Sequence, residues 1–339
     1  MIRNSFLKKS FVLLLFVAAV SVSCCKPSEP SDPFKGKPIQ FTTARAVTTK
    51  ASFNGKQPDG KYQIVWKNGD VLRISSPEVS WADYLISIQS NLSLSPKTNG
   101  TELRWGTGLH HFYAVYPSCD INGNVVSANI PSIQGSVLLL SLVEEEDREY
   151  APLLSQYGFM AAAAEASPSN DPVSLSFNPL FCALQFYVSS EAEEPVQVSG
   201  FRVESAGGGA LAGCFTAALA AQADPAVTID PATTSPQITV TLDSDSSHPL
   251  LQGAVMKITA IALPQDLTNL TAYFTVNGQE IALPLVDNDG NPITVHPGQT
   301  VDVVAYGLLT PEGSDPEPET PVGITISIDG IVVSEYELN

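Results

Sequence analysis

The sequence predicts an all-β protein made of two tandem β-sandwiches, with one further strand appended at the C-terminus. Short apolar runs of strand length recur along the chain, and turn-forming Gly, Pro, Asn and Asp residues separate them. The 339 residues are enough for about two domains. The final stretch alternates apolar and polar side chains over residues 322–338, which is far longer than a common strand.

The composition indicates a folded, acidic protein. Hydrophobic residues form 44% of the chain and charged residues only 15%, below the usual quarter or so. The formal net charge is −18. Because phosphate contacts need clustered Lys and Arg, this charge argues against a nucleic-acid partner.

Residues 1–23 have the pattern of an export signal, with three basic residues before an apolar run that is too short to span a bilayer. The order Ser21-Val22-Ser23-Cys24 resembles a bacterial lipoprotein cleavage box, with Ser21 where Leu is usual. We therefore predict a mature chain that begins at a lipidated Cys24, carries fatty acyl chains such as palmitate, and is anchored to a membrane without a spanning helix. Lipidation of Cys25 and an ordinary cleaved signal peptide are the alternatives.

Residues 24–37 are predicted to be a tether, and an N-terminal sandwich is predicted over 38–172. The Asn-Gly pair within 67–70 predicts a hairpin turn, because both residues tolerate positive φ. Residues 138–155 are less regular and could hold a helical turn around 144–148. The expected strands of this half are 38–41, 62–66, 71–75, 84–88, 102–105, 111–116, 124–130 and 157–162.

The loop 166–172 predicts a domain boundary, and a C-terminal sandwich is predicted over 173–309. Asn277-Gly278 predicts a second hairpin turn. The Ala-rich stretch 217–223 is expected to be a short helix or a loop. The expected strands are 173–177, 181–188, 196–204, 238–242, 256–263, 272–276, 280–285 and 300–306.

The chain ends in a linker and a strand. Residues 310–321 are rich in Pro and acidic residues and are predicted to be an extended spacer. Residues 322–339 then form the candidate donor strand. It either folds back onto its own chain as an edge strand or serves another molecule. Its even positions are apolar or small, and the residues expected to act in donation are Ile324, Ile326, Ile328, Val332 and Tyr336.

Residue types that often carry chemistry form no catalytic or metal-binding pattern here. Asp287-Asn-Asp-Gly-Asn291 resembles the start of a calcium loop, but its twelfth position is Gly298 instead of Glu, so a hairpin turn is expected. We predict no catalytic residue, no metal, no cofactor and no enzymatic activity. The residues considered are the histidines His110, His111, His248 and His296, and the cysteines Cys119, Cys182 and Cys214.

The tryptophans leave an alternative function open. Trp66, Trp81 and Trp105 could form a platform on which sugar rings stack, although Trp is as often part of a sandwich core. Three exposed, coplanar indoles would favour a surface glycan-binding lipoprotein of the outer membrane. Burial of the indoles would argue against this platform.

Several stretches resemble the fimbrillin family, the outer-membrane fimbrial subunits of Bacteroidetes (type V pilins). Residues 111–117 resemble the aromatic strand of that family that ends in Tyr-Pro, and 157–161 resemble its Met-x-Ala strand. Residues 173–188 and 296–303 resemble later strands. The acidic linker and the terminal strand follow in the same order, so the resemblance covers most of the chain.

The resemblance implies transthyretin-like sandwiches and a route of assembly. Subunits are exported as lipoproteins, and a protease then removes the first strand and exposes an apolar groove. The C-terminal strand of another copy or of a homologous subunit fills this groove, and a surface fimbrium that serves adhesion grows. The cut matches the bond between Arg45 and Ala46, with Lys50 as the alternative. The first strand is short, with Ile39 and Phe41 as its clearly apolar residues, so an uncleaved anchor or tip is the other possibility.

Overall fold

The structure is a computed structural model. It describes residues 32–43, 52–56, 62–66, 68–88, 92–135, 137–140, 153–190, 193–242, 249–287, 289–306 and 323–333. Within these ranges almost every regular element is a strand, apart from the short helix α2 (Leu154–Tyr157), which confirms the all-β prediction. No helix among the described residues is long and apolar enough to cross a membrane.

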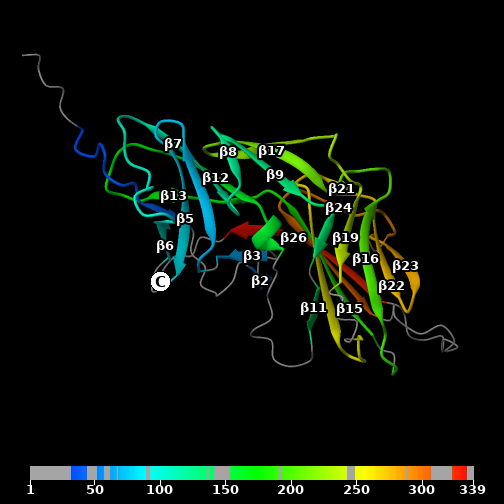
Figure 1. Ribbon diagram of the computed structural model, residues 1–339. Helices are drawn as coiled ribbons and strands as arrows, with labels where there is room; N and C mark the ends of the chain where they lie inside the picture. Colours follow the sequence, from blue (N-terminus) through cyan, green and yellow to red (C-terminus); the bar gives the residue numbers. More distant parts are fainter. Residues whose placement is uncertain are drawn as a thin grey trace, which may run out of the picture.

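A six-stranded sheet forms the left-hand part of the molecule in Figure 1. Its order is β14 (Asn178–Pro179), β12 (Met160–Ala166), β7 (His110–Tyr116), β4 (Val71–Ser76), β5 (Ser80–Ile88) and β6 (Leu92–Pro96). Alternate residues of its strands point into the core, as the period of two requires. The buried residues Leu72, Ile74, Tyr84, Phe112 and Tyr116 are examples.

A four-stranded sheet of order β18 (Ala223–Ile229), β17 (Gly213–Ala220), β9 (Val125–Ile130) and β8 (Asp120–Asn122) lies beside it. Phe159, just before β12, meets Phe215 of β17 with a ring-centroid distance of 6.0 Å. A two-stranded parallel sheet joins β1 (Phe41–Thr43) to β13 (Val173–Leu175).

Two further sheets form a sandwich on the right of Figure 1. One sheet has the order β10 (Ile133–Gly135), β19 (Gln237–Thr241), β16 (Val198–Ser205), β22 (Leu270–Val276) and β23 (Gln279–Pro284). The other has the order β11 (Val137–Leu140), β20 (Val255–Ala262), β15 (Cys182–Ser189), β25 (Gln299–Tyr306), β26 (Gly323–Val333), β3 (Tyr62–Val65) and β2 (Ser52–Lys56). Between them, the Phe186 ring lies 4.8 Å from that of Phe201 and 6.2 Å from that of Phe274. A small sheet of β21 (Leu267–Thr268) and β24 (Thr294–Val295) completes the described strands.

Strands cross the predicted boundary at residue 172. β10 pairs with β19, β11 pairs with β20, and β9 pairs with β17, so segments from both halves share sheets. These shared sheets do not define two separate units at residue 172. The division into an N-terminal and a C-terminal sandwich stays a prediction.

Three local predictions were wrong. The turn at Asn68 and Gly69 joins β3 and β4, which belong to different sheets, so it closes no hairpin. Residues 102–105 form no strand and contribute only an isolated bridge between Arg104 and Pro38. The Ala-rich stretch belongs largely to β17, because Phe215, Ala217 and Leu219 alternate as a buried face.

The second hairpin prediction was right. Asn277 and Gly278 have φ values of 47° and 81° and join the paired strands β22 and β23. Asp287 begins the other predicted turn: its backbone N–H donates to the Asn291 carbonyl at 2.8 Å.

Candidate functional site

The N-terminal segment, residues 34–43, leaves a turn at Gly36 and then runs along the protein to the strand β1 at its end. The Gly36 N–H donates to the Trp105 carbonyl, and the Ile39 N–H donates to the Leu103 carbonyl, both at 2.8 Å. At its C-terminal end the segment continues as β1, which pairs in parallel with β13 over three residues. Backbone hydrogen bonds thus hold the segment against two parts of the chain.

Two apolar side chains anchor the N-terminal segment. Ile39 and Phe41 are only 4% and 6% exposed. The Phe41 ring packs edge-on against Tyr84 and Phe112, with centroid distances of 5.4 and 5.3 Å. A cavity of about 500 Å³ lies beside the segment and is lined by Ile39, Phe41, Tyr84, Leu92 and Leu94, among others. Removal of the segment would therefore open an apolar groove on the six-stranded sheet.

The predicted processing residues adjoin this segment. Arg45 and Ala46 come two and three residues after Thr43, the last residue of β1, and lie outside the described residues. Cys24 also lies outside them. Cleavage after Arg45 and lipidation of Cys24 stay predictions.

The candidate donor strand is paired within its own chain in this structure. β26 runs antiparallel to β25, with Ile324 opposite Ala305, Ile326 opposite Val303 and Ile328 opposite Val301. Val301 and Val303 are fully buried. Figure 1 shows β26, in red, next to β3, with which Ile331–Val333 pair in parallel.

This pairing corresponds to the first of the two alternatives for the terminal strand, the one in which it folds back. β26 is internal in its sheet, however, and not at an edge, because it links β25 to β3. Val332 takes part in the pairing with β3, opposite Gln63. Tyr336 and the linker 310–321 lie outside the described residues.

The adjacent histidines point to opposite sides of β7, as strand geometry requires. His110 is fully buried, and its ring accepts a hydrogen bond from the Gly106 N–H and lies 2.9 Å from the Gly108 carbonyl. His111 faces solvent and pairs with Glu78 at 2.7 Å. Among the residues that the structure describes, no group of three or more His, Cys, Asp or Glu side chains could hold a metal ion.

The three tryptophans do not form the platform that was considered as the alternative, because two of them are buried. Trp66 is fully buried and packs edge-on against Tyr116 and Phe177, with both centroid distances at 5.1 Å. Trp105 is 3% exposed, and its indole N–H donates to the Ser169 carbonyl. Trp81 alone of the three is exposed, at 55%.

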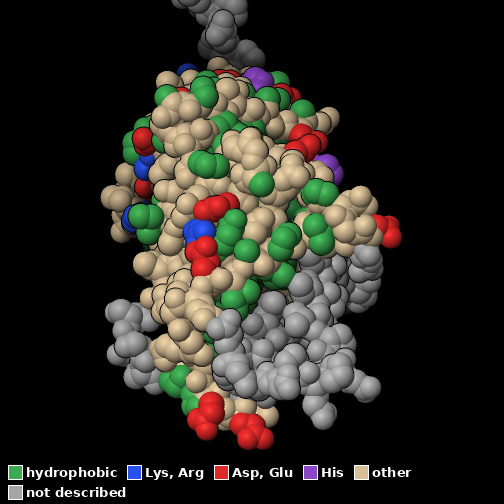
Figure 2. All heavy atoms as spheres, turned by 90° about the vertical axis from the view of Figure 1, so that its right-hand side faces the viewer, with side chains coloured by type: hydrophobic (Ala, Val, Ile, Leu, Met, Phe, Trp, Pro, Cys, Tyr) green, Lys and Arg blue, Asp and Glu red, His purple; other side chains and the backbone are tan. Residues whose placement is uncertain are grey.

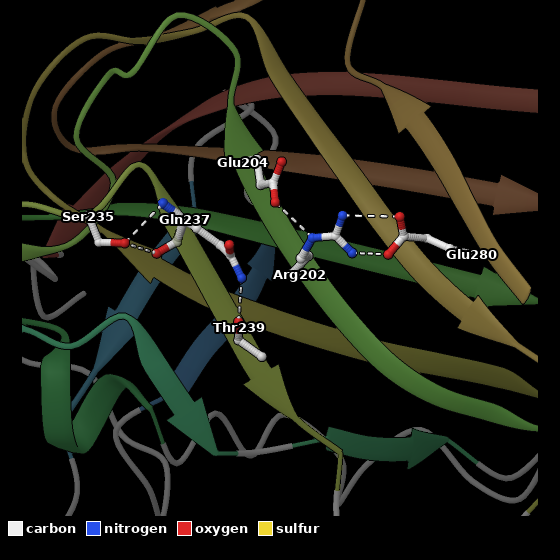
Figure 3. Close-up of polar contacts among 6 residues, drawn as sticks. All are labelled: Arg202, Glu204, Ser235, Gln237, Thr239 and Glu280. Carbon is white, nitrogen blue, oxygen red and sulfur yellow. Dashed lines mark hydrogen bonds and ion pairs between the residues drawn. The ribbon is translucent and has the colours of Figure 1, made fainter. Parts of the chain in front are cut away.

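Sequence reasoning missed a polar cluster on the outer face of the five-stranded sheet. Arg202 lies between Glu204 and Glu280 and forms ion pairs with both, as Figure 3 shows. Its guanidinium also stacks on Tyr273, 3.9 Å from the ring centroid. These contacts raise the pKa of Arg202, chiefly through the hydrogen bond to Glu280. The partners come from β16, β22 and β23, so only the strand register could have revealed the cluster.

This cluster has the character of a structural network and not of a reactive site. The neighbouring residues Ser235, Gln237 and Thr239 form a chain of ordinary hydrogen bonds (Figure 3). In Figure 2, backbone and uncharged polar side chains cover most of the described part of this side of the molecule, with scattered hydrophobic side chains and small patches of charged groups.

Comparison with known proteins supports the fold. No protein-family model and no curated protein matches the sequence. A crystal structure of a candidate cell adhesion protein from Bacteroides ovatus is 14% identical, covers 88% of this chain and 99% of its own, and has a TM-score of 0.52. A similar protein from Bacteroides uniformis is 14% identical, covers 86% and 98%, and has a TM-score of 0.51. The chain therefore shares the fold of these two Bacteroides proteins, the fold class that its sequence predicted.

Proposed function

We propose that this chain is a non-enzymatic subunit of an outer-membrane fimbrium that serves adhesion. The observation that carries the proposal is the N-terminal segment, which buries Ile39 and Phe41, ends in the strand β1, and stops two residues before Arg45. The shared fold with proteins described as candidate cell adhesion proteins supports the adhesive role.

The N-terminal segment is held weakly enough to be removable. Burial of a large apolar side chain contributes about 1.5–3 kcal/mol, and the segment buries Ile39 and Phe41 as its main anchors. Its regular pairing with β13 extends over only three residues. A covalent link to the rest of the chain therefore matters for its retention, and cleavage after Arg45 would allow a longer strand to displace it.

The terminal strand is the proposed replacement. β-strand addition supplies backbone hydrogen bonds along the whole inserted strand, and alternate side chains supply the specificity. In this proposal, the pairing of β26 with β25 and β3 belongs to the unassembled subunit, and the Pro-rich linker allows the strand to reach another copy. Export as a lipoprotein through Cys24 would first anchor the subunit in the outer membrane.

Limited proteolysis of the purified precursor tests this function. A trypsin-like protease should cut after Arg45 and leave a folded core that begins at Ala46, and electron microscopy should then show filaments. Arg45→Gln should prevent both the cut and the filaments. Arg104→Gln is the matched control, because Arg104 contacts the segment through the Gly36 carbonyl but is not at the predicted cut.

Two results would overturn the proposal. One is an Arg45→Gln protein that forms filaments as well as the wild type. The other is a wild-type precursor that is cut only inside its described sheets and never yields an Ala46 N-terminus.

A further inference from the structure

Trp81 is the exposed member of the three tryptophans, and it is held in a fixed place. It lies on the outward face of β5, opposite Ser75 of β4. Large aromatic side chains contribute most to stability when they are buried, so a Trp that is 55% exposed and stacks on a charged side chain is a candidate for contact with a ligand. Trp66 and Trp105 show the ordinary outcome in the same protein, since they are buried.

Arg73 fixes one face of the Trp81 indole. Its guanidinium carbon lies 4.3 Å from the ring centroid, which is a cation–π contact. Arg73 is itself held by Asp83 through two hydrogen bonds of 2.8 and 3.3 Å, and by the Cys119 carbonyl at 3.2 Å. These bonds use three of its five N–H groups, so two remain for a ligand.

A pocket opens beside this pair, where the six-stranded and four-stranded sheets meet. Its volume is about 370 Å³, near the lower end of the usual range for small-molecule sites. Arg73 and Trp81 come from the six-stranded sheet. The other lining residues come from β8 and β9 of the four-stranded sheet and are Asp120, Ile121, Asn122 and Ser127.

The lining combines one aromatic face with planar hydrogen-bonding groups. Asp120 supplies a carboxylate that is 95% exposed and lies 3.7 Å from Arg73, and Asn122 supplies an exposed carboxamide. Asp83 already pairs with Arg73, so the Asp120 carboxylate leaves the pocket with one negative charge, which disfavours an anionic ligand. A ligand with one apolar face and several hydroxyl groups at its edge fits this lining, and a small cation is the competing ligand to be tested.

We propose that this pocket binds one uncharged pyranose unit of a glycan. The C–H face of the sugar packs on the free part of the Trp81 indole, and its hydroxyls bond to Asp120, Asn122 and the remaining N–H groups of Arg73. This inference deepens the adhesive part of the proposed function and rests on it.

Binding can be measured on the unassembled protein with four probes: the methyl glycosides of galactose, mannose, glucose and N-acetylglucosamine. At least one should give saturable tryptophan fluorescence changes and saturation-transfer NMR signals, with a Kd on the order of 1 mM. Trp81→Ala should abolish both signals, Trp81→Phe should retain part of them, and Asn122→Ala should weaken binding about tenfold. Because Trp81 and Asn122 lie on the surface, these variants should stay folded, and Trp81→Ala should lower the melting temperature only slightly through loss of its contact with Arg73.

Leu109→Ala is the matched control, since Leu109 is another exposed large apolar side chain, at 50%, and does not line the pocket. The inference is overturned if none of the four glycosides binds, if Trp81→Ala binds as well as the wild type, or if choline competes equally well for the site.

The same variants separate this inference from the proposed function. Trp81→Ala should leave cleavage after Arg45 and filament formation unchanged. Filaments without sugar binding would overturn the pocket alone. Sugar binding without cleavage or filaments would overturn fimbrial assembly and leave a glycan-binding surface protein.

Discussion

His111 and Glu78 join two strands at a single point on the surface. His111 lies on β7, and Glu78 lies in the turn between β4 and β5. The Glu78 carboxylate is 2.7 Å from the His111 ring and also accepts a hydrogen bond from the His111 backbone N–H. Glu165 of β12 approaches the other ring nitrogen at 3.4 Å. Through these two carboxylates, His111 therefore connects β7 to β12 and to the turn between β4 and β5.

Stability should depend on pH through this pair. The hydrogen bond to Glu78 raises the pKa of His111, so this contribution to stability is present at low pH and is lost as pH rises through the raised pKa. Partial burial alone would raise the pKa of Glu78, but its hydrogen bonds with His111 lower it to about 2. Its contribution is lost as pH falls from about 4.5 toward 2.

Thermal unfolding measured between about pH 5 and pH 9 checks this expectation, because the interval brackets the ordinary pKa of histidine. The wild type should lose stability over the upper part of the interval relative to His111→Gln. Glu78→Gln should remove most of the same difference. A difference that persists unchanged in both variants would show that other groups cause it.

The sequence predicted part of this site. Strand alternation indicated that His110 and His111 face opposite sides, because that geometry is local. It could not identify Glu78 as the partner, because 33 residues separate the two side chains and only the sheet register brings them together. The same limit applies to Arg73, which meets Asp120 of another sheet.

At the scale of the element, β26 is the strand whose role can be tested most sharply. Ile326 and Ile328 lie opposite the buried Val303 and Val301, whereas Ser327 lies opposite Asp302. The alternation of apolar and polar residues along the sequence assigns the two isoleucines to the apolar face of β26. A charge buried on such a face without a partner costs several kcal/mol.

We expect Ile326→Asp and Ile328→Asp each to block filament formation, and Ser327→Asp to be tolerated as the matched control. A chain that ends at residue 321 should still fold, because the Phe186, Phe201 and Phe274 cluster lies on strands other than β26, but it should not assemble. Circular dichroism and electron microscopy provide the two readouts. A truncated chain that forms filaments, or one that never folds, would refute strand donation.

Elements with local signals were predicted well, and elements with long-range causes were not. The alternating runs that became β7, β15 and β25 are visible in the sequence, as is the Asn277-Gly278 hairpin. The Asn68-Gly69 turn has the same local signal, yet it joins different sheets because β3 pairs with β26 and β2 instead of β4. The Ala-rich β17 was missed because small side chains give a weak apolar–polar alternation. Its own residues Phe215 and Leu219 carry the alternation more clearly.

At the scale of the whole molecule, the proposal requires an anchor at the start of the mature chain. Cys24→Ala should abolish incorporation of labelled palmitate and release the protein from the outer-membrane fraction. Cys25→Ala is the matched control and should leave both unchanged. Full labelling of Cys24→Ala would show that Cys24 is not the lipidated residue. The assignment would then pass to Cys25 or be withdrawn.

The sheet order at this scale could not be predicted, although the fold class could. Frequent turns and short apolar runs establish an all-β chain through local signals. The order of strands depends on pairings such as β10 with β19 and β11 with β20, which join residues about a hundred positions apart. No single-sequence pattern encodes such a pairing.

The exchange of strands between the two halves also constrains the order of folding. Pairings that are distant in sequence form slowly, because a long loop must close before they contribute to stability. β3, near the start of the chain, pairs with β26, the last described strand, so the seven-stranded sheet cannot be completed until residues 323–333 have been synthesised. During synthesis, the place of β26 between β25 and β3 therefore stays vacant longest. During that interval, the terminal strand of a neighbouring chain can compete kinetically for the place between β25 and β3.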